Sequence, residues 1–493
     1  MGASATAGDR SFHLRVFGCQ MNVYDGELIR AAFLRRGWSE TDDPERARLH
    51  LFHTCSVREN AEERVHGLLG ELRRRKREDP SVVVAVVGCM ADREGEELFD
   101  REPHVDVVCG SRWFPRLPDY VDRVLGGEER VCMLGDSAGP VDAPVRDLAG
   151  RDGGHSAHVA VMRGCDLNCT YCIVPSVRGR VESRPLDAIV AEVRALVDDG
   201  VTEVHLLGQT IDAYGRDRRG DDAPDLARLL DALAEVDGLL RLRLVTLHPS
   251  YVTRELAAAM ARSPQFLRFL PVPLQSGSDR VLKRMKRGYN LDLYRRRIAL
   301  LREAMPDLEL VSDWIVGFPG ETDEDFAASE RAMEEFGFLQ SYVFQYSPRP
   351  GTYAAERLAD DVPAAVKKER NHRLLALQRS LAPARTRAWV GRRSAVLLEG
   401  PARDDDAWWL GRTHNGHWAR LPFRPGFRAG LLREVRLTGW NRRELVAEEV
   451  RPEEPLPEAP SRRRAAPAAD GGDGGLLLRT PSPGAGPAGP IPV

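Results

Sequence analysis

The stretch Cys165-Asp-Leu-Asn-Cys169-Thr-Tyr-Cys172 places three cysteines at the spacing C-x3-C-x2-C. A short loop with this spacing can direct three thiolates at one face of an iron–sulfur cube. Cubane 4Fe-4S clusters usually take four cysteine ligands, so three local ligands leave one iron open to another group. A zinc site would need a fourth ligand nearby, and none follows at finger-like spacing. Disulfides would need an oxidising compartment, which nothing in the sequence indicates. The loop is therefore predicted to hold a 4Fe-4S cluster.

The composition is that of a cytoplasmic globular protein. The 493 residues suffice for about three domains. Lys and Arg number 71 against 74 Asp and Glu, so the formal net charge of −3 does not by itself indicate a nucleic-acid-binding protein. No apolar run approaches the length of a membrane span, and the first ten residues lack the apolar stretch of a signal peptide. We therefore expect no membrane contact, and eight reduced cysteines that are available to metal.

Short apolar runs alternate with amphipathic stretches from residue 11 to about residue 130. This alternation predicts an α/β fold with a doubly wound parallel sheet. One run, Val82–Val87, is almost pure valine, as expected of a strand buried on both faces. The predicted strands are His13–Phe17, Arg48–His53, Val82–Val87 and Val105–Val108, and the predicted helices are Asp25–Arg36 and Glu59–Arg77.

Three further cysteines, Cys19, Cys55 and Cys89, each follow one of the first three strands of this domain. Ligands gather beyond the carboxyl ends of the strands in open parallel sheets, so these cysteines should meet at one edge. They are predicted to form a second site with three thiolates. The alternative is three unrelated buried thiols, since free cysteine is a common core residue. Cys109 and Cys132 are interpreted as structural thiols.

The central region, residues 157–383, contains six predicted strands with helices between them. Parallel units of this kind close into a barrel, here a partial (β/α)6 barrel, and chemistry lies at the C-terminal mouth of the strands. The 165–172 loop follows the first strand and so lies at that mouth. The predicted strands are His158–Arg163, Val204–Leu207, Leu240–Val245, Leu267–Val272, Leu308–Val316 and Tyr342–Tyr346, and the predicted helices are Asp187–Val197, Leu226–Val236, Arg254–Ala261, Leu293–Ala304 and Glu324–Phe336.

Polar and glycine motifs end the later strands at the same mouth. Glycine there lets the backbone approach a ligand closely. Each motif alone could be a turn or a helix cap, and Glu321 and Thr322 could simply serve the next helix. Four motifs at one rim are better explained by a binding site. Arg178 and Arg180 could contact an anion or could be surface arginines. The motifs are Gly208-Gln-Thr-Ile-Asp212, Thr246-Leu-His-Pro249, Pro273-Leu-Gln-Ser-Gly-Ser278 and Gly317-Phe-Pro-Gly-Glu-Thr322.

Short alternating stretches in residues 384–450 predict a small β-barrel. Between residues 385 and 447 there are 13 arginines, no lysine and six acidic residues, and five of the eight tryptophans lie there. Arginine with exposed aromatic side chains suits phosphate contact and base stacking, so RNA binding is favoured over a barrel that uses tryptophan only as core. Residues 1–10 and 451–493 are predicted to be flexible or disordered, and residues 131–156 to form a linker.

The C-x3-C-x2-C loop resembles the signature of the radical S-adenosylmethionine (SAM) enzymes, and the motifs together resemble their methylthiotransferase family. Gly411-Arg-Thr413 with Asn415 resembles the TRAM module that grips RNA. The resemblance spans about residues 11–447. Its other motifs are Phe17-Gly-Cys-Gln-Met-Asn-Val-Tyr-Asp25, Thr54-Cys-Ser-Val-Arg-Glu-Asn-Ala61, Gly88-Cys-Met-Ala91, Arg163-Gly-Cys165, Cys172-Ile-Val-Pro175, Arg178-Gly-Arg180, Gln275-Ser-Gly-Ser-Asp279, Ile315-Val-Gly-Phe-Pro-Gly-Glu-Thr322 and Tyr346-Ser-Pro-Arg-Pro-Gly-Thr352.

The resemblance implies two 4Fe-4S clusters, with SAM as both methyl donor and radical source. One cluster, held by Cys165, Cys169 and Cys172, would bind SAM and generate the radical. The other would be an auxiliary cluster that carries a sulfur ligand, held by Cys19, Cys55 and Cys89. The residues expected to bind SAM are Gly208, Gln209, Gln275, Ser276, Gly277, Arg178 and Gly317.

Within the family the chain most resembles the branch that adds a methylthio group to C2 of N6-isopentenyladenosine at position 37, beside the tRNA anticodon. It departs from that branch at Thr210 and Asp212, where Asn is usual, and at Leu247, where Ser is usual. The alternatives are action on a ribosomal-protein aspartate or on another tRNA adenosine, and a non-catalytic iron–sulfur RNA-binding protein. The expected partners are tRNA, a sulfur donor and a flavodoxin- or ferredoxin-like electron donor, and the expected state is a monomer.

Overall fold

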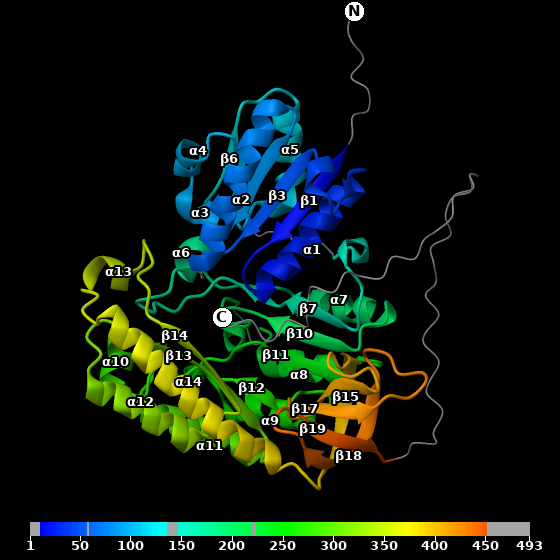
Figure 1. The fold of residues 1–493 in the computed structure, drawn as a ribbon, viewed down its shortest axis with the longest axis vertical. Helices are drawn as coiled ribbons and strands as arrows, with labels where there is room; N and C mark the ends of the chain where they lie inside the picture. Colours follow the sequence, from blue (N-terminus) through cyan, green and yellow to red (C-terminus); the bar gives the residue numbers. More distant parts are fainter. Residues whose placement is uncertain (1–9, 57–58, 136–145, 219, 221–222, 451–493) are drawn as a thin grey trace, which may run out of the picture.

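The computed structural model describes residues 10–56, 59–135, 146–218, 220 and 223–450. The predicted flexible N-terminus, apart from residue 10, and the predicted disordered tail lie outside the described residues, as do positions 136–145 of the predicted linker. An N-terminal sheet domain sits on a central half-barrel, and a small C-terminal barrel packs beside the latter (Figure 1). No helix in these ranges is long and apolar enough to cross a membrane.

The N-terminal domain is a six-stranded, all-parallel sheet in the order β2-β1-β3-β4-β5-β6. Successive residues of β4 serve opposite faces: Val83 and Ala85 pack with α1 and α5, while Val84 packs with α2, α3 and α4. Both faces are therefore covered, which confirms the doubly wound prediction. The elements are β1 (Ser11–Val16), α1 (Gln20–Arg35), β2 (Ser39–Glu40), β3 (Leu49–Thr54), α2 (Glu59–Glu78), β4 (Val83–Gly88), α3 (Cys89–Glu94), α4 (Glu97–Arg101), β5 (Val107–Cys109), α5 (Leu117–Leu125) and β6 (Val131–Met133).

Strands β1, β3, β4 and β5 are shifted by one or two residues from the prediction, and two larger differences concern α1 and β6. Helix α1 begins at Gln20, earlier than the predicted start at Asp25, because Cys19 takes extended backbone (φ −95°, ψ 173°) and the helix follows at once. Strand β6 lies in the segment predicted as a linker, because Val131 is buried and pairs with Val107 at the sheet edge. The earlier helix start brings the first turns of α1 next to the cysteines.

The central domain is a half-barrel of six parallel strands in the order β7-β10-β11-β12-β13-β14, as predicted. A parallel bridge between Leu242 and Phe266 joins its two three-stranded halves. The strands are β7 (Ser156–Ala160), β10 (Glu203–Leu207), β11 (Arg241–Leu244), β12 (Phe269–Pro271), β13 (Glu309–Val316) and β14 (Gln340–Gln345), with a hairpin of β8 (Met162–Arg163) and β9 (Glu182–Ser183).

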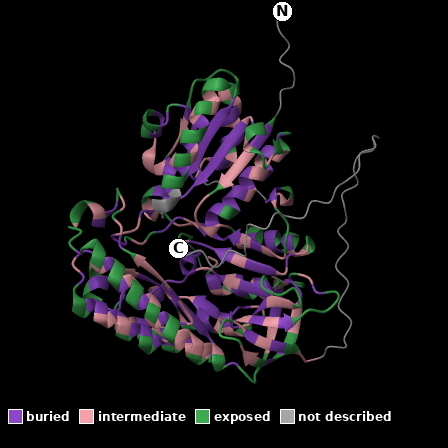
Figure 2. Ribbon diagram, viewed as in Figure 1, coloured by how far each residue is buried: buried purple, intermediate pink, exposed green. Residues whose placement is uncertain are grey.

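Helices cover the outside of the half-barrel, and its strands are mostly buried except for the edge strand β14 (Figure 2). Long helix α14 packs along the edge strand β14 and beside α12. The helices are α6 (Val174–Arg178), α7 (Leu186–Asp198), α8 (Leu226–Ala234), α9 (Arg254–Arg262), α10 (Asp279–Arg284), α11 (Leu291–Ala304), α12 (Asp323–Phe336), α13 (Tyr353–Arg357) and α14 (Ala364–Arg387).

The C-terminal unit is a closed five-stranded barrel in the order β15-β16-β17-β19-β18, which confirms the small β-barrel. Its interior is apolar and includes Val396, Leu421 and Leu437. The strands are β15 (Arg393–Pro401), β16 (Trp408–Thr413), β17 (Trp418–Pro422), β18 (Leu432–Trp440) and β19 (Leu445–Glu449).

Candidate active site

The first cysteine loop runs from β8 to α6 at the C-terminal mouth of the half-barrel. Gly164 enters it with φ 71°, and a Cβ there would lie 1.9 Å from the carbonyl oxygen of Arg180, so only glycine fits. The Cys172 amide donates to the Cys169 carbonyl (3.1 Å) and closes a tight turn. Cys165 and Cys169 are buried and Cys172 is half-buried.

Two polar side chains contact these thiols. The Oγ1 atom of Thr210 lies 3.3 Å from Cys165 Sγ, and buried Arg287 donates from Nη1 to Cys169 Sγ (3.2 Å). Burial raises the pKa of the Cys172 thiol to about 12, so its ligand form needs a bound cation. The sequence motifs included Thr210. They missed Arg287, because nothing in its spacing separates it from the other basic residues.

The N-terminal cysteines meet beyond the carboxyl ends of β1, β3 and β4. A hydrogen bond from Cys55 and the positive charge of Arg178 lower the pKa of Cys19 to about 6, although burial opposes the shift. Gly18 has φ 110°, and a Cβ there would lie 2.2 Å from Cys55 Cβ. Glycine therefore allows the two cysteine loops to touch. The structure brings together Cys19 and Cys55, and Cys89 joins them around Arg178, which donates to Cys89 and whose charge acts on all three thiols.

Asn22, in the first turn of α1, ties the cysteine loops to one another. Its Nδ2 donates to the carbonyls of Phe17 (2.7 Å) and Thr54 (2.8 Å), at the ends of β1 and β3. Its Oδ1 accepts from Arg178 Nη2 (2.7 Å), and Arg178 Nε donates to Cys89 Sγ (3.3 Å). The amide and the guanidinium thus connect all three strand ends.

The two cysteine sets adjoin across the domain boundary. Cys89 packs with Ile173 and Val177 in one buried cluster, and Ile173 directly follows Cys172. Helices α3 and α6 lie side by side at this boundary (Figure 1). The Ser111 hydroxyl donates to the Val177 carbonyl (2.8 Å) and fixes α6 to the N-terminal domain. A reaction at one set of cysteines would therefore take place next to the other set.

Gln209 and Gln275 have features of ligand-binding residues. The Oε1 atom of Gln209 is buried and makes no hydrogen bond within the described part of the chain. Gln275 has φ 71°, a conformation that costs energy for a non-glycine residue and is concentrated at functional sites. Gly208 packs closely on Met162, since a Cβ there would lie 2.8 Å from Met162 Cγ.

Three other predicted SAM contacts have hydrogen-bond partners within the protein. Gly277 donates its amide to Ser329 Oγ of α12 (2.9 Å), and Ser276 Oγ lies 3.5 Å from the same hydroxyl. Arg178 lies at the N-terminal cysteines, as described above. Its neighbour Arg180 has a side chain that is 92% exposed, as expected of a surface arginine.

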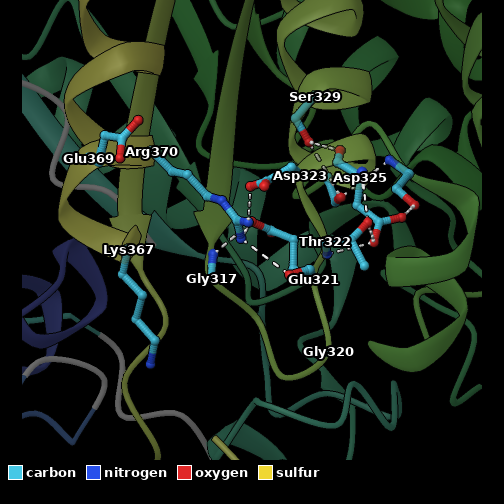
Figure 3. Close-up of polar contacts among 12 residues, drawn as sticks. Gly317, Gly320, Glu321, Thr322, Asp323, Asp325, Ser329, Lys367, Glu369 and Arg370 are labelled. Carbon is cyan, nitrogen blue, oxygen red and sulfur yellow. Dashed lines mark hydrogen bonds and ion pairs between the residues drawn. The ribbon is translucent and has the colours of Figure 1, made fainter. Parts of the chain in front are cut away.

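The Gly317–Thr322 loop is held by its own side chains and by α14 (Figure 3). The Gly317 amide donates to Glu321 Oε1 (3.0 Å), and Arg370 of α14 donates to the same oxygen (2.7 Å). Thr322 is the N-cap of α12 and forms a capping box with Asp325. Thr322 thus serves the next helix, as the alternative had it, whereas Glu321 binds the Gly317 amide and Arg370. The Gly317 amide already has a partner within the loop.

Three comparisons with known proteins agree with this geometry. The radical SAM superfamily pattern matches residues 159–333, and that of uncharacterized protein family UPF0004 matches residues 11–110. A tRNA-2-methylthio-N(6)-dimethylallyladenosine synthase of Bordetella bronchiseptica is 43% identical over 425 residues, 85% of this chain and 88% of the relative. A synthase of the same name from Rhodopirellula baltica is 40% identical over 408 residues, 80% and 85% of the two chains.

The chain belongs to the tRNA-2-methylthio-N(6)-dimethylallyladenosine synthase family. The fold agrees with a solved structure of the radical SAM methyltransferase TsrM from Kitasatospora setae, with a TM-score of 0.54 and 17% identity over 71% of this chain and 77% of that one. Membership of this synthase family implies 4Fe-4S clusters and SAM as cofactors.

The two cysteine sets fit the clusters that the synthase family implies. Each set offers three thiols, and in each an arginine donates to one sulfur: Arg287 to Cys169 and Arg178 to Cys89. Hydrogen bonds to sulfur and nearby positive charge suit an anionic cluster. Among the residues described, no three His, Cys, Asp or Glu side chains converge as a single metal ion requires. A cubane instead places each thiolate on a different iron.

Two departures from the synthase pattern, Asp212 and Leu247, are buried in the structure. Burial raises the pKa of Asp212 to about 8, so its carboxyl is neutral at neutral pH, like the usual asparagine. Its Oδ2 accepts from the His248 amide (2.8 Å). Leu247 is buried in the core of the half-barrel.

The C-terminal barrel packs against the central domain through the segment that resembles the TRAM module, Gly411-Arg-Thr413 with Asn415. Arg412, Thr413 and Asn415 are buried, and Asn415 donates to the carbonyl and the carboxylate of Asp307 in the central domain. The Arg412 guanidinium also lies 3.9 Å from the Trp418 ring centroid, and in a second pair the Arg420 guanidinium is 4.8 Å from the Trp408 ring centroid. Among the five tryptophans, the buried one is Trp389, which donates to Glu309 (3.2 Å).

Proposed function

We propose that the chain is a tRNA methylthiotransferase, which adds a methylthio group to C2 of N6-isopentenyladenosine at position 37 of tRNA. The observation that carries this is the contact of two three-cysteine sets through Cys89 and Ile173. One set suits radical formation and the other suits sulfur transfer. Identity of 40–43% to synthases of this name supports the substrate.

In this proposal Cys165, Cys169 and Cys172 hold the cluster that binds SAM, and that cofactor supplies a 5′-deoxyadenosyl radical able to abstract hydrogen from an unreactive C–H bond. The chain's own residues position the reactants. Arg287 places positive charge beside Cys169, and the unpaired Gln209 oxygen is free to accept a hydrogen bond from SAM.

Cys19, Cys55 and Cys89 hold the auxiliary cluster and the sulfur to be transferred. The reaction needs a sulfur donor and external electrons, and we propose a flavodoxin- or ferredoxin-like donor for the latter. We further propose a cytoplasmic monomer whose C-terminal barrel, a TRAM-like module, contacts tRNA. The stacked pairs Arg420–Trp408 and Arg387–Trp440 support base and phosphate contact by that barrel.

Two single substitutions separate the two roles. Cys169→Ala should abolish SAM cleavage and thiolation together. Cys55→Ala should leave some SAM cleavage to 5′-deoxyadenosine and give no thiolated tRNA. Both are measured anaerobically with reductant, by chromatography of deoxyadenosine and mass spectrometry of tRNA nucleosides. Thiolation by Cys55→Ala would contradict the assignment of two clusters.

A further inference from the structure

Arg178 belongs to the central domain, yet its guanidinium group lies within the N-terminal domain. It ends helix α6, which follows the first cysteine loop. Its side chain is 5% exposed. Nε donates to Cys89 Sγ (3.3 Å), Nη2 donates to Asn22 Oδ1 (2.7 Å), and Nη1 lies 3.6 Å from Asp25 Oδ2. All three nitrogens thus contact groups of the neighbouring domain.

These contacts reach every cysteine loop of the auxiliary set. Arg178 touches Cys89 directly. It touches the other two loops through Asn22, whose amide donates to the carbonyls of Phe17 and Thr54 beside Cys19 and Cys55. Because Arg178 comes from the central domain, the auxiliary site is complete only when the two domains are docked.

The positive charge of Arg178 offsets negative charge that the auxiliary site would hold. Three thiolates and the fully buried Asp25 carboxylate would place several negative charges in the interior, where unpaired charge is costly. Arg163 pairs with Asp25 (2.5 Å) and offsets that carboxylate. Arg178 lies on the thiol side. Reduction of a cluster adds another negative charge, and hydrogen bonds to sulfur and local charge set its potential.

We infer that Arg178 is a positioning residue of the auxiliary cluster, supplied by the central domain, which stabilises the cluster's reduced state and makes its assembly depend on domain docking. This inference rests on the proposed function, because it requires an auxiliary cluster at Cys19, Cys55 and Cys89.

The test uses the full chain with Cys165→Ala, Cys169→Ala and Cys172→Ala as the parent, so that only the auxiliary cluster is present. Into this parent are introduced Arg178→Met, Arg178→Gln and Arg178→Lys. The matched control is Arg180→Met, two residues along, whose side chain is 92% exposed. After anaerobic reconstitution, iron per chain is measured, and the midpoint potential is measured by a redox titration followed by electron paramagnetic resonance.

Arg178→Gln is expected to shift the midpoint to more negative potential. At the parent's midpoint the ratio of reduced to oxidised cluster should fall at least tenfold, which is about 59 mV for one electron. Arg178→Lys keeps the positive charge but not the forked set of donors, so its midpoint potential should lie between those of Arg178→Gln and the parent. Arg180→Met should match the parent in iron and potential.

Parent-like iron and potential in Arg178→Gln and Arg178→Met would overturn the inference. If Arg178→Met binds no iron, the other two variants decide the outcome. A parent-like midpoint potential in Arg178→Gln would refute the role of the charge. A midpoint that becomes more negative from the parent to Arg178→Lys to Arg178→Gln would support it. A parent that holds no iron would instead remove the auxiliary cluster, and with it both the proposed function and this inference.

Discussion

The buried ion pair between Arg370 and Glu321 should be the main polar support of the Gly317–Thr322 loop (Figure 3). The two side chains are 6% and 2% exposed. Arg370 Nη1 donates to Glu321 Oε1 at 2.7 Å, and Nη2 lies 2.8 Å from the exposed Asp323 carboxylate. Arg370→Met removes the cation and leaves the Glu321 carboxylate in the interior with the Gly317 amide as its donor.

Removing one partner of a buried pair costs about 3–5 kcal/mol, because the other charge remains without compensation. Burial already raises the pKa of Glu321, and without Arg370 the carboxyl can take up a proton. Protonation limits the cost, so we expect a loss of about 3 kcal/mol in the free energy of unfolding at neutral pH. Arg373, one turn along α14, provides the matched control. Its pair with Glu330 is 50% and 25% exposed, so Arg373→Met should cost below about 1 kcal/mol.

The assay is urea unfolding of the full chain followed by circular dichroism, for Arg370→Met, Arg373→Met, Glu321→Gln and the double variant Arg370→Met with Glu321→Gln. The double variant should be more stable than Arg370→Met alone, since neutral glutamine needs no counter-ion and can still accept from the Gly317 amide. Equal losses for Arg370→Met and Arg373→Met would refute this reasoning. So would a double variant whose loss is the sum of the two single losses.

Three further predictions follow from close contacts and buried charges. Gly18→Ala should displace Cys55, because the added Cβ would lie 2.2 Å from Cys55 Cβ at a backbone φ of 110°. We expect the reconstituted chain to lose half of its bound iron. Full retention of iron would contradict this prediction. Burial raises the pKa of Asp212 to about 8. The unfolded chain releases this proton near pH 4, so the group lowers stability as pH rises from about 4 to 8. Asp212→Asn should flatten that slope in urea midpoints taken at pH 6 and pH 8; an unchanged slope would show that Asp212 is ionised in the folded chain. Asn415→Ala should cost about 1 kcal/mol by removing the hydrogen bonds to the half-buried Asp307, measured by thermal unfolding of the full chain, and an unchanged Tm would contradict it.

The sequence was sufficient to predict the three units and the placement of the cysteines. Strand ends are marked by apolar runs, and the carboxyl ends of parallel strands share one edge, so the meeting of Cys19, Cys55 and Cys89 followed from order alone. The predicted start of α1 was wrong because its N-cap is Cys19. Cysteine is not a usual N-cap residue, so no signal in the sequence marks this helix start.

The residues that complete the site come from distant parts of the chain. Arg287 reaches Cys169, and Arg178 reaches Cys89 from another domain, across separations that periodicity does not encode. The orientation of the C-terminal barrel could not be predicted from the sequence either. The sequence associated Asn415 with RNA contact, but its side chain bonds to Asp307, because which face of a barrel docks depends on the shape of its neighbour.

The most direct test of the account is an anaerobic reaction of the reconstituted protein with SAM, reductant and tRNA that carries N6-isopentenyladenosine. The nucleosides are then digested and analysed by mass spectrometry, with tRNA lacking the isopentenyl group as the control. The account predicts a methylthio group on that adenosine and none in the control. Release of 5′-deoxyadenosine without any methylthiolated nucleoside would contradict the proposed substrate, and failure to cleave SAM at all would contradict the proposed chemistry.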